Sequence, residues 1–189
     1  MPINNPSFID PSAINPINNG RLIFTSQQEV VSDGIELRED GSWGLPNECS
    51  HMMTLTKQGV FNCEGPSGFH QIPVEQYMTK GTNIYVFSLV NMNPQAYQAW
   101  CMIVASRLGK VPYDFLQIIG QAIGLDFLHM PGTDDCSEEG VREMKGLAPY
   151  MPQTYQDLVK SLSNQINPQQ GINACFSNPS IINFDGLWS

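Results

Sequence analysis

Short apolar runs along the chain predict its main strands. Residues 21–26 contain the apolar run Leu22-Ile23-Phe24, and residues 83–90 are apolar for most of their length. The second run is nearly continuous, which is typical of a central strand that is buried on both faces. Residues 68–76, which lie between these two runs, are expected to form a loop.

A β-hairpin is predicted for residues 50–65, where two apolar runs flank a turn at residues 57–59. If Lys57 and Gln58 form the loop, His51 lies directly opposite Glu64. If Gln58 and Gly59 form it, Met53 lies opposite Glu64 and His51 is the diagonal neighbour of Glu64. Because side chains on a strand alternate with a period of two, both registers leave His51 and Glu64 on one face of the hairpin.

Apolar residues at helical spacing predict four helices in the second half of the chain. The first begins at Asn93-Pro94, since asparagine is a favoured N-cap and proline is favoured at the first helical position, and Gly109 ends it. The other three helices are predicted over residues 113–124, 136–145 and 154–162.

The two ends of the chain combine apolar residues with proline and asparagine. Residues 1–19 contain four prolines and five asparagines, and residues 163–189 have a similar composition in which only Asp185 is charged. Because closely spaced prolines oppose regular helix, both segments are predicted to be extended arms on a domain of residues 20–162. Such arms either pack on their own domain or dock on a partner protein, and the sequence favours neither.

The charge distribution excludes several classes of partner. The chain of 189 residues is 41% hydrophobic and carries 18 acidic and 9 basic residues, a net charge of −9. The basic residues form no cluster, which argues against nucleic acid or an anionic membrane as a main partner. No apolar run is long enough to span a membrane, and the N-terminus lacks a secretion signal. We therefore expect a chain that is made in the cytosol and leaves, if at all, by another route.

The five cysteines include no Cys-x-x-Cys pair, so they fit neither a disulfide framework nor a zinc site. Cys136 differs from the other four because it opens the predicted helix 136–145 directly after a loop. The amide groups of a first helical turn and the helix dipole favour thiolate, the nucleophilic form of the side chain. Cys136 is therefore the candidate nucleophile, and the other four are expected to be buried apolar side chains.

A nucleophilic thiol needs a base and a group that orients this base. His51 and Glu64, on one face of the hairpin, offer an imidazole and a carboxylate that fixes its tautomer. His70 is a poorer candidate because it lies in a predicted loop with no paired acid, and His129 lies on the connection only seven residues before Cys136. Seen alone, a pair such as His51 and Glu64 is more often a surface strand histidine and an unrelated acid.

Four short motifs occur in the order found in a known family. They are Ser50-His51, Glu64-Gly65, Tyr113-Asp114-Phe115-Leu116 and Cys136-Ser137-Glu138. In this order the chain resembles the circularly permuted branch of the NlpC/P60 cysteine hydrolases, which includes the YiiX-like and lecithin-retinol-acyltransferase-like proteins. The resemblance covers about residues 20–150. It implies an α+β fold of the permuted papain-like type, with an antiparallel sheet packed against helices.

The resemblance also implies a role for each motif residue. Cys136 would be the nucleophile, His51 the general base and then acid, and Glu64 the residue that orients the imidazole. The backbone N–H of Cys136 and the Tyr113 hydroxyl would stabilise the oxyanion. The reaction would be acyl transfer through a thioester, without a metal or cofactor. The two aspartates directly before the cysteine depart from the family pattern and oppose thiolate formation.

Three hypotheses for the function follow from these residues and this resemblance. Relatives cut peptidoglycan peptides or act on lipid acyl groups, and the acidic composition favours the cell-wall substrate. The missing secretion signal and the two arms are explained if a bacteriophage particle carries the protein, so the first hypothesis is a virion-associated cysteine peptidase or amidase. The second is a structural or adaptor subunit whose papain-like site is idle, and the third is a lipid thioesterase or acyltransferase.

Overall fold

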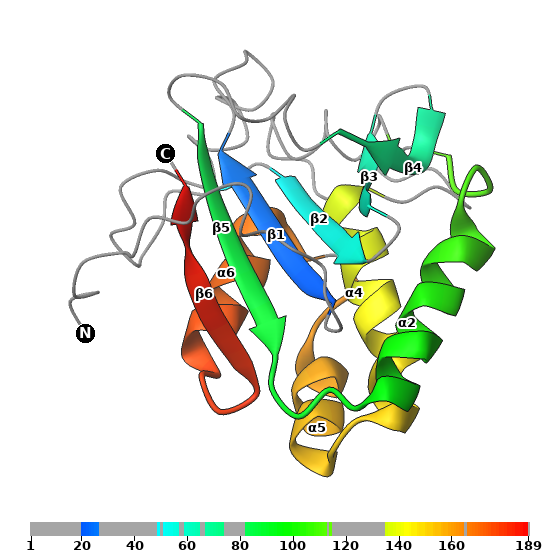
Figure 1. Cartoon of the computed structure of the whole chain (residues 1–189). Coiled ribbons are helices and arrows are strands. Elements are labelled where there is room, and N and C mark those ends of the chain that lie inside the picture. Colours follow the sequence, from blue (N-terminus) through cyan, green and yellow to red (C-terminus); the bar gives the residue numbers. More distant parts are fainter. Residues whose placement is uncertain are drawn as a thin grey trace.

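The structure, a computed structural model, describes residues 20–26, 49, 51–56, 59–64, 67–73, 82–112, 114, 135–164 and 166–188. Within these ranges the fold is α+β, with a six-stranded antiparallel sheet and four α-helices packed against it (Figure 1). The helices are α2 (Pro94–Arg107), α4 (Cys136–Leu147), α5 (Gln153–Ser161) and α6 (Pro168–Ser177), with a 3₁₀ turn, η4 (Ala148–Tyr150), between α4 and α5.

The sheet has the strand order β4-β3-β2-β1-β5-β6, and every neighbouring pair of strands is antiparallel. The prediction of a central strand near residues 83–90 is confirmed, because β5 lies between β1 and β6. The predicted first strand and the predicted hairpin are also confirmed. The strands are β1 (Arg21–Ser26), β2 (His51–Thr56), β3 (Gly59–Glu64), β4 (Gly68–Ile72), β5 (Asn83–Leu89) and β6 (Ile182–Trp188).

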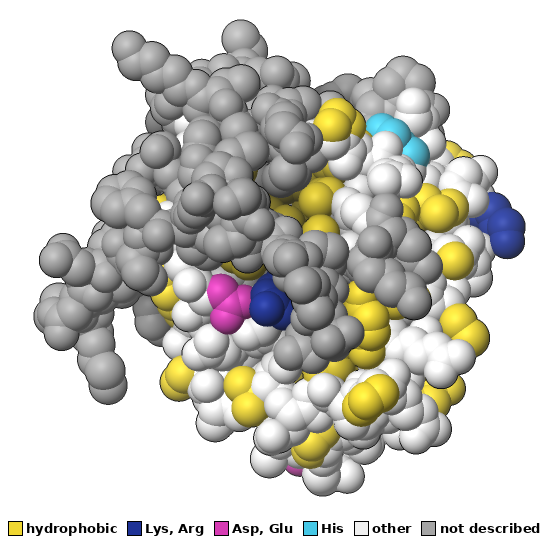
Figure 2. All heavy atoms as spheres, viewed as in Figure 1, with side chains coloured by type: hydrophobic (Ala, Val, Ile, Leu, Met, Phe, Trp, Pro, Cys, Tyr) yellow, Lys and Arg dark blue, Asp and Glu magenta, His cyan; other side chains and the backbone are white. Residues whose placement is uncertain are grey.

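The side chains of the sheet form two separate apolar clusters, one on each face. Leu22 and Phe24 of β1 belong to the larger cluster, which they share with side chains of all four helices, including Trp100 and Met144. Ile23, between them, belongs to a smaller cluster made only of strand residues. On the side of the molecule drawn in Figure 2, most of the described side chains are hydrophobic or uncharged. The sheet is thus buried on both faces, and the described helices lie on the face of the larger cluster.

The predicted helices at residues 94–108, 136–145 and 154–162 are confirmed as α2, α4 and α5. The side chain of Asn93 caps α2, because its Oδ1 accepts a hydrogen bond of 2.8 Å from the backbone N–H of Ala96. Pro94 stands at the start of this helix, as the sequence predicts.

The prediction of a loop over residues 68–76 is wrong for its first part, which forms β4. The N–H of Phe69 donates to the carbonyl of Val111 and the carbonyl of Phe69 accepts from Gly109, both at 2.9 Å. These bonds hold β4 from its outer side. Gly68 has a φ of +61°, and a Cβ there would lie 2.0 Å from the Val111 carbonyl oxygen, so this close approach requires glycine.

The prediction of an irregular C-terminal arm over residues 163–189 is also wrong. This segment contains α6 and β6, and β6 extends the sheet by pairing with β5. The physical reason is a capping box in which Asn167 and Gln170 bond each other's backbone N–H groups. The asparagine and proline that we interpreted as opposing helix therefore start one. The predicted arm of residues 1–19 and the predicted helix of residues 113–124 lie outside the described residues, apart from Asp114.

Candidate active site

Cys136 is the first residue of α4, which confirms the predicted start of this helix. Asp135 is the N-cap, and its carboxylate accepts hydrogen bonds from the backbone N–H of Glu138 at 2.7 Å and from the Ser137 hydroxyl at 2.8 Å. The Cys136 side chain is only 3% exposed. The helix N-terminus favours a thiolate at this position, whereas the adjacent Asp135 carboxylate opposes it.

His51 is the first residue of β2 and is half-buried. The hairpin pairs Thr56 with Gly59 and Thr54 with Phe61, so its loop consists of residues 57 and 58. This is the first of the two predicted registers. The paired part of the hairpin ends at Thr54 and Phe61, and the same register, continued beyond it, would put position 64 opposite His51.

Helix α4 runs beside β2 in the same direction. A Cβ on Gly140 would lie 2.6 Å from Cε of Met52, and further along both elements the Thr54 hydroxyl donates to Glu143 at 2.7 Å. Cys136 is one helical turn before Gly140, and His51 directly precedes Met52. The N-terminus of α4 therefore comes to the end of β2 at which His51 lies.

The alternation of β2 predicts, however, that the His51 side chain leaves the strand on the face away from α4. Met52 and Thr54 face α4, as their contacts with Gly140 and Glu143 show. Met53 belongs to the cluster on the opposite face. Because side chains alternate along a strand, His51, two residues earlier, is expected on the same face as Met53. By alternation alone, His51 is expected on the face of β2 opposite to α4, at the end of the strand to which Cys136 comes.

The start of α6 is attached both to α4 and to the segment before β2. The hydroxyl oxygen of Ser137 also lies 2.6 Å from the carbonyl oxygen of Ile166, so its single hydrogen is shared between this carbonyl and the Asp135 carboxylate. The side-chain oxygen of Gln169 accepts a hydrogen bond of 3.0 Å from the backbone N–H of Cys49, two residues before His51. These two contacts fix the first turn of α4 relative to the strand that carries His51.

The remaining candidates are placed as follows. Tyr113 and His129 lie outside the described residues. His70 is half-buried on β4, with its Nδ1 2.8 Å from the carbonyl oxygen of Gly68. Asp114 is fully buried. In the described part of the chain, no three His, Cys, Asp or Glu side chains are grouped to hold a metal ion, and none of the helices is long and apolar enough to cross a membrane.

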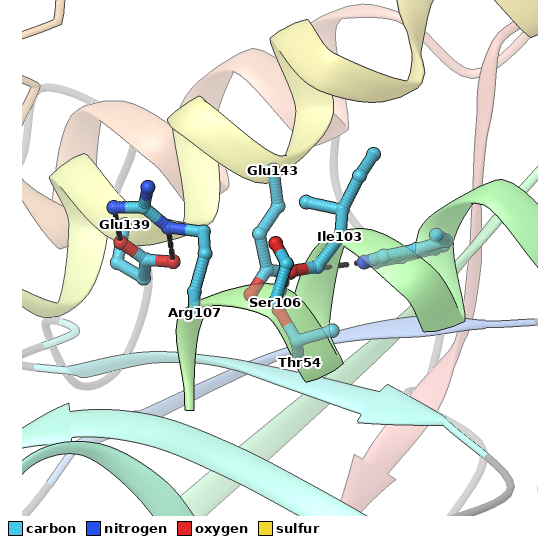
Figure 3. Close-up of polar contacts among 7 residues, drawn as sticks. Thr54, Ile103, Ser106, Arg107, Glu139 and Glu143 are labelled. Carbon is cyan, nitrogen blue, oxygen red and sulfur yellow. Dashed lines mark hydrogen bonds and ion pairs between the residues drawn. The ribbon is translucent and has the colours of Figure 1, made fainter. Parts of the chain in front are cut away.

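Sequence reasoning missed the role of the buried carboxyl groups on α4. Glu139 forms a bidentate ion pair with Arg107 of α2, and Glu143 bonds Thr54 and Trp100 (Figure 3). Glu143 lies seven residues after Cys136 and three after Gly140, so helical spacing puts all three on the stripe that faces the sheet. That spacing is the feature of the sequence from which its burial could have been predicted.

Burial raises the pKa of Glu143 to about 8. The hydrogen bonds from Thr54 and Trp100 and the Arg107 charge act in the opposite direction, while the Glu139 charge adds to the rise. Glu143 is therefore mostly protonated at pH 7, which allows a carboxyl group to lie in the core between β2, α2 and α4.

Comparisons of the chain with protein-family models, with curated proteins and with solved structures found no match.

Proposed function

We propose that the chain is a cysteine hydrolase that cleaves amide bonds, with peptidoglycan peptides as its substrate class. The observation that carries this proposal is the position of Cys136, at the start of a 12-residue helix whose N-terminus comes to the His51 end of β2. The order of the four motifs, which resembles that of the permuted NlpC/P60 proteins, supports it.

In this reaction the Cys136 thiolate attacks the carbonyl carbon of the scissile amide, with His51 holding the proton taken from the thiol. The carbon–nitrogen bond then breaks, the amine leaves with the proton from His51, and a thioester remains. Water, deprotonated by His51, attacks the thioester and releases a carboxylic acid and the thiol. The backbone N–H of Cys136 donates to the oxyanion in both steps. The mechanism requires the imidazole of His51 to reach Cys136 past the first residue of β2.

A second function is favoured by the alternation of β2 and by the burial of Cys136. Both fit a structural or adaptor subunit in which the papain-like site is idle, for example in a phage particle. Because α6 and β6 belong to the folded domain, the docking arm in this case is residues 1–19 alone. Deleting residues 1–19 would then abolish binding to the partner and leave the domain folded.

The test of the proposed function is the release of soluble peptide fragments from purified bacterial sacculi. We expect the wild-type protein to release them and Cys136→Ala and His51→Ala each to lower the rate by about three orders of magnitude or more. His70→Ala is the matched control, since it removes a histidine from the same face of the sheet, and it should retain activity. Full activity in Cys136→Ala or His51→Ala would exclude this mechanism, and inactivity of the wild-type protein would favour the structural function.

A further inference from the structure

Glu143 joins three elements of the core through a single carboxyl oxygen. Its Oε2 accepts hydrogen bonds from the Thr54 hydroxyl of β2 at 2.7 Å and from the indole N–H of Trp100 in α2 at 2.9 Å. The side chain itself belongs to α4 and is 0% exposed. Figure 3 shows Glu143 and Thr54 pointing toward one another between the helix and the strand.

The charged and titratable groups around Glu143 do not neutralise a carboxylate there. Glu139, on the same helix, is itself acidic. Arg107 of α2 donates two N–H groups to the Glu139 carboxylate and none to Glu143. Tyr155 of α5 lies close enough to interact electrostatically with two groups, Glu143 and Cys175 of α6. Burial raises the pKa of both Tyr155 and Cys175 far above their usual values, so both are neutral. The Arg107 charge lowers the pKa of Glu143, but its ion pair is with Glu139, and among the described residues no cation forms a salt bridge with Glu143.

We infer that Glu143 is a proton-controlled latch that holds α4 against β2. In the neutral form the carboxyl group is compatible with the core and keeps the hydrogen bonds to Thr54 and Trp100. Loss of the proton places a charge in the core without a cation of its own, which is strongly unfavourable unless water reaches it. The close approach of Gly140 to Met52 shows how tightly α4 lies on β2, so hydration of Glu143 requires this contact to open.

The consequence is a local, reversible opening of α4 at alkaline pH. Because Cys136 begins this helix, the same opening would displace the thiol from the end of β2. The latch does not depend on the proposed hydrolase function, since it concerns only the docking of one helix. Its failure and the failure of the hydrolase proposal are therefore separate results.

Two NMR measurements on the full chain between pH 6 and pH 10 test the latch. The first follows the indole N–H resonance of Trp100, which should shift with a midpoint near pH 8 because its acceptor is Glu143. The second follows hydrogen exchange of the α4 amides. After correction for the intrinsic rate, exchange should accelerate about tenfold per pH unit up to the midpoint, where the opened helix ionises and the closed one does not, and should level off above it.

Glu143→Gln keeps the shape and an acceptor oxygen but cannot ionise, so both pH responses should disappear. Asp157→Asn is the control, because it makes the same change on an exposed position of α5. Thr54→Val removes a hydrogen bond that lowers the Glu143 pKa, so the Trp100 midpoint should move upward. A wild-type Trp100 resonance that does not titrate, or one that titrates equally in Glu143→Gln, would overturn the proposal even if no variant of Thr54 folds. The proposal would also be overturned if the corrected exchange rates of the α4 amides were the same in the wild-type protein and in Glu143→Gln at every pH.

Discussion

The free energy of unfolding is expected to fall by roughly 4 kcal/mol as the pH rises from 4.5 to about 8, through Glu143 alone. Below pH 4.5 this carboxyl group is protonated in both the folded and the unfolded chain, so its contribution to stability is fully present. Between pH 4.5 and 8 the unfolded chain releases the proton while the folded chain keeps it. Stability is therefore lost as the pH rises, and the loss levels off once the folded state also ionises.

Urea unfolding at a series of pH values measures this effect as the difference between the wild-type protein and Glu143→Gln. The variant should lack the decline and should be the more stable of the two at pH 8. Asp157→Asn serves as the control for a carboxyl group lost from an exposed helix position. A difference between wild type and Glu143→Gln that is constant from pH 4.5 to pH 8 would show that Glu143 is not a buried neutral acid.

Replacement of Arg107 by methionine is expected to lower the free energy of unfolding by about 3 kcal/mol at pH 7. Arg107 is partly exposed on α2, but its partner Glu139 has a side chain only 1% exposed, so the substitution leaves a buried carboxylate without its bidentate ion pair. Denaturant unfolding measures the loss.

The double variant Arg107→Met/Glu139→Gln removes both charges and should recover much of that stability, because no unpaired carboxylate then remains. Lys160→Met, which removes a cation from an exposed position of α5, should change stability by less than about 0.5 kcal/mol. If Arg107→Met were no more destabilising than Lys160→Met, the ion pair would have no role in attaching α2 to α4.

The elements that could be predicted from the sequence are those specified by adjacent residues. Asn93-Pro94 predicts the start of α2, and the residues around the turn at 57–58 predict the hairpin. The start of α4 at Cys136 follows from the loop before it and the apolar spacing after it. In each case the determining interactions lie within a few residues of one another along the chain.

The elements that were missed depend on contacts between distant parts of the chain or on an asparagine–proline pair interpreted in the wrong sense. Strand β4 is held on its outer side at Phe69 by residues about 40 positions later. The pair Asn167-Pro168 starts α6 in the same way as Asn93-Pro94 starts α2, but the surrounding prolines and asparagines favoured an irregular arm. The buried acids of α4 contradict the general rule that charged residues lie at the surface.

The candidate site shows the same division. The hairpin register and the helix-opening cysteine could both be predicted, because they are local features. Which face of the sheet α4 covers could not be predicted, because it depends on packing between Gly140 and Met52. That packing places α4 on one face of the sheet, whereas alternation predicts His51 on the other. The cysteine mechanism therefore depends on whether the side chains of Cys136 and His51 meet at the end of β2.

The most direct test of that meeting is the rate at which iodoacetamide alkylates Cys136 between pH 5 and pH 9, followed by mass spectrometry of the modified peptide. If His51 activates the thiol, Cys136 should react well below the midpoint of about pH 8.5 of an ordinary thiol. His51→Ala should then slow the reaction at pH 7 at least about tenfold and move the midpoint upward, whereas His70→Ala should not. Slow alkylation with an ordinary midpoint, unchanged in His51→Ala, would contradict the proposed Cys136–His51 pair.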